Sequence, residues 1–413
     1  MGDSDITTRL LICGGGNGAH AYAGIASSKK NVEVRVLTLY SDEAERWTNA
    51  MENHDFVVNF DCGGKHNGEI RAKPSMVSKD PAEVALGCNV IVIVVPAFAH
   101  EQYLRALEPY IQPGTIIVGM PGQAGFEFAC WGILGAKGKQ CTLVSFESLP
   151  WACRIEEFGR TAEVKGTKQQ LVGALLYGDP RPVREPSAVL QETLGTHPVL
   201  HIHGHLLGMT LMGVNAYIHP AILYGRWWNW DGRPVAEPPL FYHGMDEFTA
   251  DTLTAMGDEV MAIAATLSKH PAGPDFSNVC HVFDWYKRCY SDEMSDTSCL
   301  LKAIRSNKAY IGLTHPCRPA EAAGDNNGGC NWEPNFGYRY ITEDIPFGLV
   351  VLCGVAQIIG VATPHMDKVV LWSQKVSGKE YLVDSTLSGR DMPDTRSPQK
   401  YGLTTIDQIL GYD

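Results

Sequence analysis

A glycine-rich segment near the N-terminus constrains the fold of this chain most strongly. A short apolar run over residues 10–13 meets the pattern Gly14-x-Gly16-x-x-Ala19, which continues into small residues compatible with a helix. Gly14 lets the chain leave a strand sharply, Gly16 removes a Cβ that would block a pyrophosphate, and Ala19 allows close packing of helix on strand. The helix N-terminus then offers N–H groups to phosphate. The segment therefore predicts a dinucleotide-binding turn between a strand and a helix.

A second strand is expected over residues 32–39, one helix length after the glycines. In such a unit, an acid near the end of this strand binds the ribose hydroxyls of NAD, about 20 residues past the glycines. Thr38 stands at that end instead, and Asp42 and Glu43 come slightly late. Arg35 lies too early to clamp a 2′-phosphate. The local residues therefore leave NAD and NADP as alternatives.

Further apolar runs alternate with helical stretches up to about residue 146. The expected strands cover residues 32–39, 90–95, 115–118 and 142–146. This order predicts a parallel, doubly wound sheet. The loops after two of these strands carry polar or turn-forming residues, with Pro96 and Ala97 in one and Gln123 in the other. Ligands bind at the carboxyl ends of parallel strands, so we expect a site there.

Helical periodicity replaces strand patterns after about residue 206. Five apolar residues at helical spacing form a stripe on one face of an expected helix: Leu253, Met256, Val260, Ile263 and Leu267. The acids Asp251, Asp258 and Glu259 lie elsewhere on the same helix. Residues 345–361 are typical of a helix buried on most sides. We place the domain boundary near Gly204. The expected fold class is α/β, with a Rossmann-type doubly wound parallel sheet in residues 1–204 and a mostly α-helical C-terminal domain in residues 205–413.

Size and composition limit the function further. A chain of 413 residues, 45% hydrophobic and 19% charged, is long enough for two globular domains. Its net charge of −12 argues against binding nucleic acid or an anionic membrane. No signal-peptide pattern or membrane-length apolar run stands out, and the 12 cysteines form no C-x-x-C pair. These features favour a soluble protein of the reducing cytoplasm, without a zinc site.

His219 is a candidate acid/base residue because it directly precedes Pro220. Helical geometry is disfavoured before proline, so we expect this histidine at a kink or helix end. A helix C-terminus would stabilise its cation, and an imidazole can both donate and accept a proton near neutral pH. The alternative is a structural histidine bonded to a carbonyl at the kink.

A second cluster lies in residues 336–346. Thr342 is expected to cap the buried helix that follows and to place Glu343 and Asp344 in its first turn, where the helix dipole favours anions. A carboxylate beside a histidine fixes its tautomer, and Arg339 offers a planar fork for a substrate carboxylate. The alternative is a capping acid with a surface Arg339–Glu343 pair at i,i+4 spacing.

Other chemistry has weaker support in the sequence. His201, His203 and His205 would share one face of a strand, but no acidic or cysteine ligand accompanies them, so we expect no metal. Neither a G-x-S-x-G motif nor a P-loop is present, which leaves hydrolase and kinase functions without support.

Several ordered motifs together make the chain resemble the opine dehydrogenases, especially the octopine dehydrogenase type of invertebrates. The resemblance covers nearly the whole chain. Its motifs are Cys-Gly-Gly-Gly-Asn-Gly-Ala-His at 13–20, Val-Pro-Ala-Phe-Ala-His-Glu at 95–101, Gln-Ala-Gly-Phe-Glu-Phe at 123–128, Leu-Pro-Trp-Ala-Cys-Arg at 149–154, His-Pro-Ala-Ile-Leu at 219–223, Arg-Tyr-Ile-Thr-Glu-Asp-Ile-Pro at 339–346 and Lys-Glu-Tyr-Leu-Val-Asp at 379–384.

The resemblance implies an NADH-dependent, reversible condensation of pyruvate with an amino acid, which regenerates NAD+ in anaerobic glycolysis. It also implies a Rossmann domain joined to a helical domain, with the site between them. By motif match, His219 is the acid/base, Asp344 orients it, and Arg339 with Gln123 binds the keto acid. The residues expected to bind NAD are Gly14, Gly15, Gly16, Asn17, Gly18, Ala19, Thr38, Arg46, Pro96 and Ala97.

The amine partner is where the chain departs from its arginine-using relatives. Glu147 and Cys153 match positions that line the amino-acid pocket in those enzymes, but Gly213 and Asn215 replace larger Met and Tyr residues. A Gly-rich insertion over residues 321–330 also changes this wall. We therefore expect alanine, glycine or taurine as the amine rather than arginine.

Three other functions stay open at this point. The chain could be an octopine dehydrogenase that uses arginine, a related dehydrogenase of a hydroxy acid or phosphorylated alcohol, or a catalytically silent nucleotide sensor. We expect a monomer or a small homo-oligomer.

Overall fold

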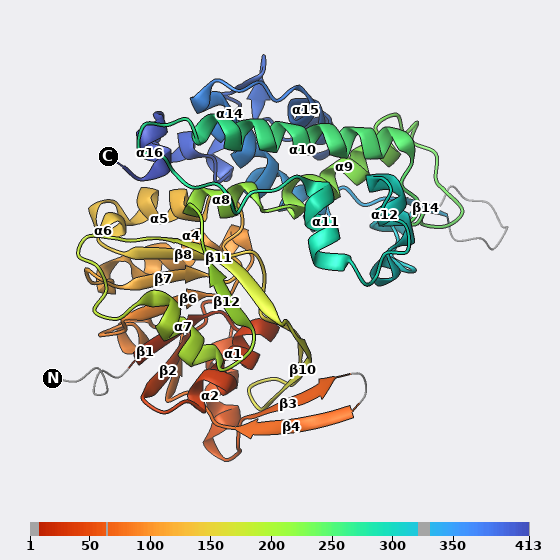
Figure 1. Ribbon diagram of the computed structural model, residues 1–413. Coiled ribbons are helices and arrows are strands. Elements are labelled where there is room, and N and C mark those ends of the chain that lie inside the picture. The colour runs from red at the N-terminus through yellow and green to blue at the C-terminus, as the bar shows by residue number, and fades with distance from the viewer. Residues whose placement is uncertain (1–7, 63–64, 321–330, 413) are drawn as a thin grey trace. The chain divides into compact units, whose positions relative to one another are not determined.

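The computed structural model describes residues 8–62, 65–320 and 331–412. The chain divides into two units, Met1–Thr210 and Leu211–Asp413 (Figure 1). The expected boundary after residue 204 lies within the first unit, just before helix α8 (Leu206–Leu211). Two expectations fall on residues outside the described ranges. They are the lack of a signal-peptide pattern at the N-terminus and the change that the 321–330 insertion makes to the wall of the amino-acid pocket.

The main sheet of the first unit has eight strands in the order β12-β11-β8-β7-β6-β1-β2-β5. From β5 to β8 all neighbours are parallel, whereas β11 runs antiparallel to β8. The strand order reverses between β1 and β6, which is the switch point of a doubly wound sheet. The expected Rossmann-type sheet is therefore confirmed. Its strands are β1 (Thr8–Cys13), β2 (Val32–Leu37), β5 (Met76–Ser78), β6 (Val90–Ile93), β7 (Ile116–Gly119), β8 (Thr142–Phe146), β11 (Gln170–Leu176) and β12 (Val199–Ile202).

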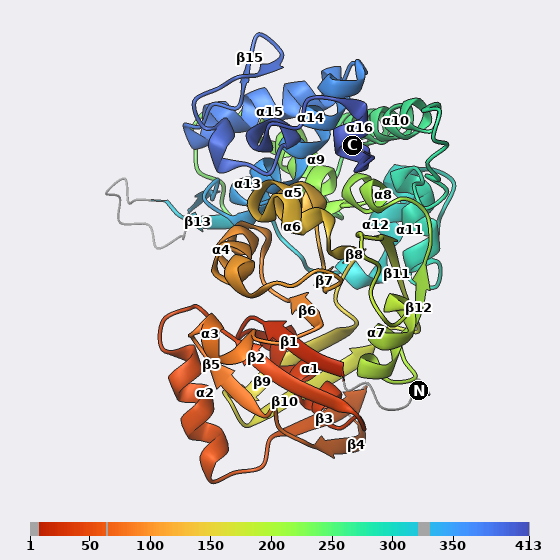
Figure 2. The same ribbon diagram turned by 90° about the vertical axis from the view of Figure 1, so that its left-hand side faces the viewer.

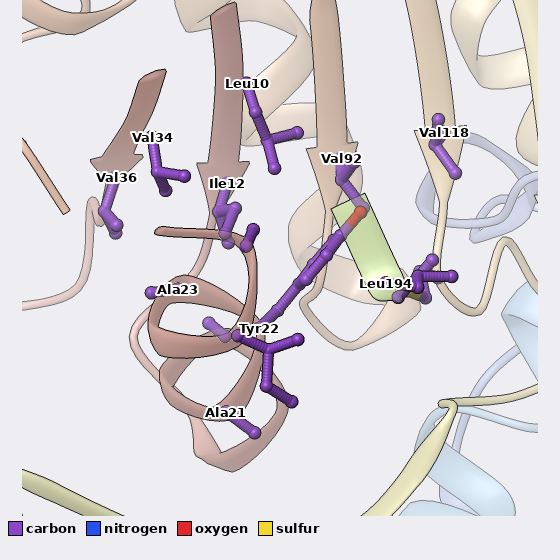
Figure 3. Packing of buried hydrophobic residues seen from close by; sticks show 14 of the residues in the cluster. Leu10, Ile12, Ala21, Tyr22, Ala23, Val34, Val36, Val92, Val118 and Leu194 are labelled. Atoms are coloured by element: carbon purple, nitrogen blue, oxygen red, sulfur yellow. The ribbon is translucent and has the colours of Figure 1, made fainter. Parts of the chain in front are cut away.

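Apolar side chains of the sheet and of helix α1 (Asn17–Ser27) form the core of this unit. Figure 3 shows Leu10 and Val92 on neighbouring strands, with Tyr22 of α1 lying across the sheet. The Tyr22 hydroxyl is paired with Thr193 at 2.6 Å, so its one polar atom is satisfied inside the core. The other helices of the unit are α2 (Glu43–Glu52), α3 (Pro81–Val84), α4 (Ala97–Leu107), α5 (Phe126–Leu134), α6 (Ala136–Lys139), α7 (Pro186–Leu194) and α8.

A second, four-stranded sheet was not expected from the sequence. Its order is β4-β3-β10-β9, with β3 (Val57–Cys62), β4 (Lys65–Arg71), β9 (Trp151–Glu157) and β10 (Thr161–Thr167) (Figure 2). Strands β9 and β10 contact α1, which also contacts β1 and β2 of the main sheet. Buried residues of this second sheet, such as Trp151 and Val164, belong to the same core. Helix α1 is thus packed against both sheets.

The second unit is mostly helical, as expected. Its helices are α9 (Asn215–Trp227), α10 (Glu247–Leu267), α11 (Val282–Tyr290), α12 (Leu300–Ser306), α13 (Arg339–Thr342), α14 (Val350–Ile359), α15 (Pro364–Ser377) and α16 (Ile406–Leu410). Two short hairpins, β13 (Cys317–Pro319) with β14 (Trp332–Pro334) and β15 (Leu382–Val383) with β16 (Thr386–Leu387), accompany them. The apolar stripe of α10 is buried, each of its five residues being at most 1% exposed.

Glu259 differs from the other acids of α10, because it is buried instead of facing solvent. Its carboxylate accepts hydrogen bonds from the backbone N–H groups of His365 and Met366, at 2.7 and 3.0 Å. These are orphan donors in the first turn of α15, so the carboxylate caps that helix from a neighbouring one.

Two segments, Leu206–Trp227 and Arg339–Ile359, are long and apolar enough to cross a membrane by length and composition. Their most apolar stretches are 89% and 72% buried within the protein. Such burial is what core helices of a globular unit require.

Candidate active site

The glycine turn of the first unit has the geometry that phosphate binding requires. Gly14 adopts φ +130°, and a Cβ there would lie 2.7 Å from the Val94 carbonyl oxygen. Gly16 is the N-cap residue of α1, and a Cβ on it would meet no atom within 4 Å. The first turn of α1 carries no acidic side chain. Open space, free helix N–H groups and the absence of nearby negative charge on α1 fit a dinucleotide phosphate.

Glu43 supplies the acid that is missing from the end of β2. The Thr38 hydroxyl donates to its carboxylate, and a Cβ on Gly15 would overlap that same carboxylate. The chain folds back after β2, so an acid that seemed too late reaches the glycine turn from the start of α2. A carboxylate at this place can accept hydrogen bonds from ribose hydroxyls.

The two arginines near this turn are engaged elsewhere. Arg35 pairs with Glu33 at 2.7 Å and donates to the Leu86 carbonyl at 3.0 Å. Arg46 pairs with Asp42 at 3.0 Å, and its guanidinium lies over the Phe158 ring at 4.3 Å. Both guanidinium groups are therefore already paired with carboxylates of the protein.

Four further predicted residues lie in the three segments that follow the carboxyl ends of adjacent parallel strands. Pro96 and Ala97 begin α4 after β6, Gln123 follows β7 with φ +58°, and Glu147 follows β8. Cys153 is different, because its side chain is 3% exposed within the core and burial raises the pKa of its thiol to about 11. Its burial leaves little thiol surface for a substrate.

In the second unit, His219 lies inside α9, four residues after the helix begins. Of the two expected places, a kink or a helix end, the helix end is therefore wrong, because His219 precedes a proline inside the helix, and no C-terminal dipole supports its cation. Pro220 is tolerated inside the helix, although it lacks the N–H that would bond to the Ala216 carbonyl. Gly213 stands between α8 and α9, and Asn215 is the exposed first residue of α9.

Three groups hold the His219 imidazole. Its Nδ1 lies 2.8 Å from Asp344 Oδ2, its Nε2 lies 3.1 Å from the Tyr242 hydroxyl, and its ring stacks on Tyr340 with centroids 3.9 Å apart. A carboxylate can only accept, so Nδ1–H donates to Asp344, and in the neutral imidazole Nε2 is then the acceptor nitrogen. The expected histidine–carboxylate pair is thus present in the structure, with side chains 11% and 15% exposed.

Asp344 reaches His219 by a different backbone path from the one expected. Thr342 is the last residue of α13 rather than the cap of the following helix, since the chain is already helical from Arg339. Asp344 stands directly before a π-helical turn, Ile345–Leu349, that leads into α14. The prediction of a Thr342 cap is therefore wrong.

Arg339 pairs with Glu343 at 2.7 Å, as the i,i+4 alternative proposed. Its side chain is 56% exposed, whereas that of Glu343 is 3% exposed. The buried carboxylate therefore holds one side of the guanidinium fork, and the exposed side is available to an anion.

Several features of this unit carried no sequence signal. Tyr242 lies in the irregular segment between α9 and α10, where neither periodicity nor a motif marks a residue. Tyr340 lies next to Arg339 in the sequence, but nothing in the sequence indicates that its ring stacks on His219. Within the described ranges, no group of three or more His, Cys, Asp or Glu residues could hold a metal ion.

A doubly wound sheet with a glycine turn, joined in one chain to a helical unit that carries a His–Asp pair, defines a two-unit, dinucleotide-dependent dehydrogenase. The family model described as NAD/NADP octopine/nopaline dehydrogenase, alpha-helical domain, matches residues 202–377. The chain is 49% identical to tauropine dehydrogenase of Arabella iricolor, over 97% of this chain and 99% of the relative. It is 46% identical to octopine dehydrogenase of Pecten maximus, over 98% and 99%.

A solved octopine dehydrogenase structure with NADH and L-arginine superimposes with a TM-score of 0.92, at 46% identity and 98% coverage of both chains. The chain therefore belongs to the opine dehydrogenase family. It is an oxidoreductase of the NAD-dependent dehydrogenase class.

Proposed function

We propose that this chain catalyses the NADH-dependent condensation of pyruvate with the amine of a small amino acid to give a secondary-amine opine, in a reversible reaction. The observation that carries the proposal is the hydrogen bond of 2.8 Å between His219 and Asp344. A binding module has no need of such an acid/base pair, and the catalysed condensation requires one.

The side chains of the second unit supply the proton chemistry. When the amine adds to the carbonyl carbon, the carbonyl oxygen must gain protons and leave as water. His219, once it has taken up a proton at Nε2 from solvent, can donate it to that oxygen while Asp344 keeps the ring oriented. Arg339 can bind the substrate carboxylate in its fork, and Glu343 keeps that fork in place.

The first unit fits a nicotinamide dinucleotide. The glycine turn from Gly14 to Ala19 would hold the pyrophosphate, and Glu43 would accept from the adenosine ribose. Bound NADH supplies the hydride that reduces the carbon–nitrogen double bond. The complexes of octopine dehydrogenases with NADH support this choice of cofactor. We propose that Pro96, Gln123 and Glu147 face the reacting end of the cofactor.

We propose alanine, glycine or taurine as the amine, in preference to arginine. The support is the small side chain set at the start of α9, with Gly213 and the exposed Asn215. A relative named tauropine dehydrogenase at 49% identity is compatible with this choice, although the octopine dehydrogenases at 46% are nearly as similar.

We also propose that the first unit is the NAD-binding domain, that the second is the substrate domain, and that the enzyme acts in the cytoplasm. The ten cysteines whose side chains the structure describes are free thiols, as is usual in a reducing compartment. A monomer or small homo-oligomer remains our proposal for the assembly.

The test follows NADH oxidation with pyruvate and each of alanine, glycine, taurine and arginine, and repeats the series with NADPH. We expect turnover with at least one small amine. We expect His219→Ala and Asp344→Asn to lower kcat by roughly 10²–10⁴-fold, the usual contribution of acid/base catalysis. NADH binding, measured by fluorescence, should be unchanged in both variants. A strong preference for arginine would refute the amine assignment, and NADH binding without turnover for any amine would refute the reaction.

A further inference from the structure

The Tyr242 hydroxyl contacts the imidazole nitrogen to which the proposed function assigns the proton transfer. It is 3.1 Å from His219 Nε2, the only imidazole nitrogen that Asp344 does not occupy. In the neutral imidazole, Nδ1–H donates to Asp344, so Nε2 is the acceptor and the phenol donates to it. Burial among other tyrosines raises the pKa of Tyr242 far above its ordinary value, so the group is a phenol and not a phenolate.

The Tyr242 ring is supported from behind. It stacks on Tyr310 with centroids 3.8 Å apart and an interplanar angle of 12°. It also meets the edge of Phe241 at 4.8 Å. These ring contacts do not involve the hydroxyl, so replacing Tyr242 by Phe should keep the packing and remove only the bond to His219.

The backbone at Tyr242 belongs to the segment between α9 and α10. In this fully described segment the structure records isolated bridges at Val235 and Leu240, but no helix or strand. The Tyr242 carbonyl accepts from Met245 N–H at 3.2 Å. Connecting segments are in general more mobile than the elements they join.

The two directions of the hydrogen bond at Nε2 exclude each other. A carbonyl oxygen carries no proton, so it can bind only to an Nε2 that bears hydrogen. The phenol donates its own hydrogen to a bare Nε2. The 2-oxo acid must therefore displace the phenol, and a proton from solvent must enter at Nε2 when it does so.

We propose that Tyr242 is a positioning residue whose hydroxyl holds the place of the 2-oxo acid's carbonyl oxygen at His219 Nε2 until that substrate binds. This inference rests on the proposed function for the identity of the incoming oxygen. The phenol keeps the imidazole oriented and its lone pair satisfied in the substrate-free protein, and it leaves Nε2 when substrate enters.

The first test compares Tyr242→Phe with the wild-type chain in steady state. A neutral hydrogen bond is worth about 0.5–1.5 kcal/mol net, or roughly a 2–10-fold change in an equilibrium constant. Because pyruvate no longer displaces the hydroxyl, we expect its KM to fall by roughly 2–10-fold, with kcat changed by less than about twofold. Tyr310→Phe is the matched control, since it removes a hydroxyl from the stacked partner ring and should leave both constants unchanged.

Two outcomes would overturn the inference. A fall in kcat of about 100-fold or more in Tyr242→Phe would make the phenol itself a proton donor in the reaction. Unchanged KM and kcat would show that the hydroxyl does not compete with substrate.

A second test needs no turnover and separates this inference from the proposed function. In the substrate-free protein labelled with ¹⁵N-histidine, the Nε2 signal of His219 is assigned by its absence in His219→Gln. At a fixed pH of about 8, this signal should move in Tyr242→Phe but not in Tyr310→Phe. An unmoved signal would refute the proposed role of the Tyr242 hydroxyl, whether or not the chain condenses pyruvate with any amine.

Discussion

Glu43 holds its carboxylate against the glycine turn although it stands on α2 rather than on the preceding strand. The carboxylate can accept from ribose hydroxyls and would repel a 2′-phosphate. One side chain therefore combines a favourable contact for NAD with an unfavourable one for NADP.

Glu43→Gln should weaken NADH binding by roughly 10–100-fold, the equivalent of about 1.5–3 kcal/mol for hydrogen bonds to a charged group. Its preference for NADH over NADPH should shrink, since the amide no longer repels phosphate. Fluorescence titration with both cofactors measures the two affinities. Asp42→Asn is the control, because the neighbouring carboxylate is exposed and paired with Arg46. Equal affinities in wild type and Glu43→Gln would contradict the assignment.

At the scale of single residues, the sequence predicted the chemistry better than the geometry. It predicted the His219–Asp344 pair through a family resemblance, because each of the two side chains lies in a motif that matches the family. It failed at Thr342, since a capping residue and a residue inside a helix share the same local sequence. It also failed to single out Tyr242, whose role depends on a tertiary contact with His219 across 23 positions of the chain.

At the scale of elements, His20 joins the glycine turn to the second sheet. Its ring stacks on Trp47 at 3.7 Å, its Nδ1 lies 3.2 Å from the Gly16 carbonyl, and its Nε2 accepts from Gly159 N–H at 3.1 Å. Both nitrogens are thus used by a neutral imidazole. Burial lowers the pKa of His20 from 6.5 to about 3.

This pKa predicts acid sensitivity of the first unit. The unfolded chain binds a proton at His20 below about pH 6.5, whereas the folded chain stays neutral there down to about pH 3. The stability from this residue is therefore complete above pH 6.5 and is lost as the pH falls toward 3. At pH 5 the loss is about 2 kcal/mol. Urea unfolding at about pH 7.5 and 5 measures it.

His20→Gln should flatten that pH dependence, because the substituted side chain does not titrate. The exposed His201 provides the control, and His201→Gln should keep the wild-type dependence. If His20→Gln retained the full loss of stability between the two pH values, another group would be responsible.

The elements themselves differ in how well sequence predicts them. Strand β8 occupies the expected residues, and β6 and β7 begin within one residue of expectation, because continuous apolar runs mark buried parallel strands. The second sheet escaped notice since its strands are half-exposed and its two hairpins, β3–β4 and β9–β10, pair with each other across about 100 positions of the chain. The sequence did not predict that Glu259 is a buried capping residue, because the three groups that bond to its carboxylate belong to α15 and not to its own helix.

At the scale of the whole molecule, each unit has its own buried core. We expect calorimetry to resolve two unfolding transitions. NADH at 100 times its Kd should stabilise the first unit by about 2.7 kcal/mol and raise the temperature of its transition. Leu253→Ala, in the core of α10, should destabilise the second unit by about 2–5 kcal/mol and identify its transition.

A single transition that moves as one with NADH and with Leu253→Ala would contradict this expectation. NADH that shifts only the transition lowered by Leu253→Ala would contradict the assignment of the nucleotide to the first unit.

The contacts of α1 with the second sheet decide whether the glycine turn can be transferred to another protein. Asn17 accepts from Ile155 N–H and His20 from Gly159 N–H, so residues 138 and 139 positions downstream help to shape the nucleotide cradle. A fragment ending after β8 would retain every motif of the glycine turn and lose both donors. The glycine turn is therefore not self-sufficient. Grafting it onto another protein would require the β9–β10 hairpin to be grafted as well.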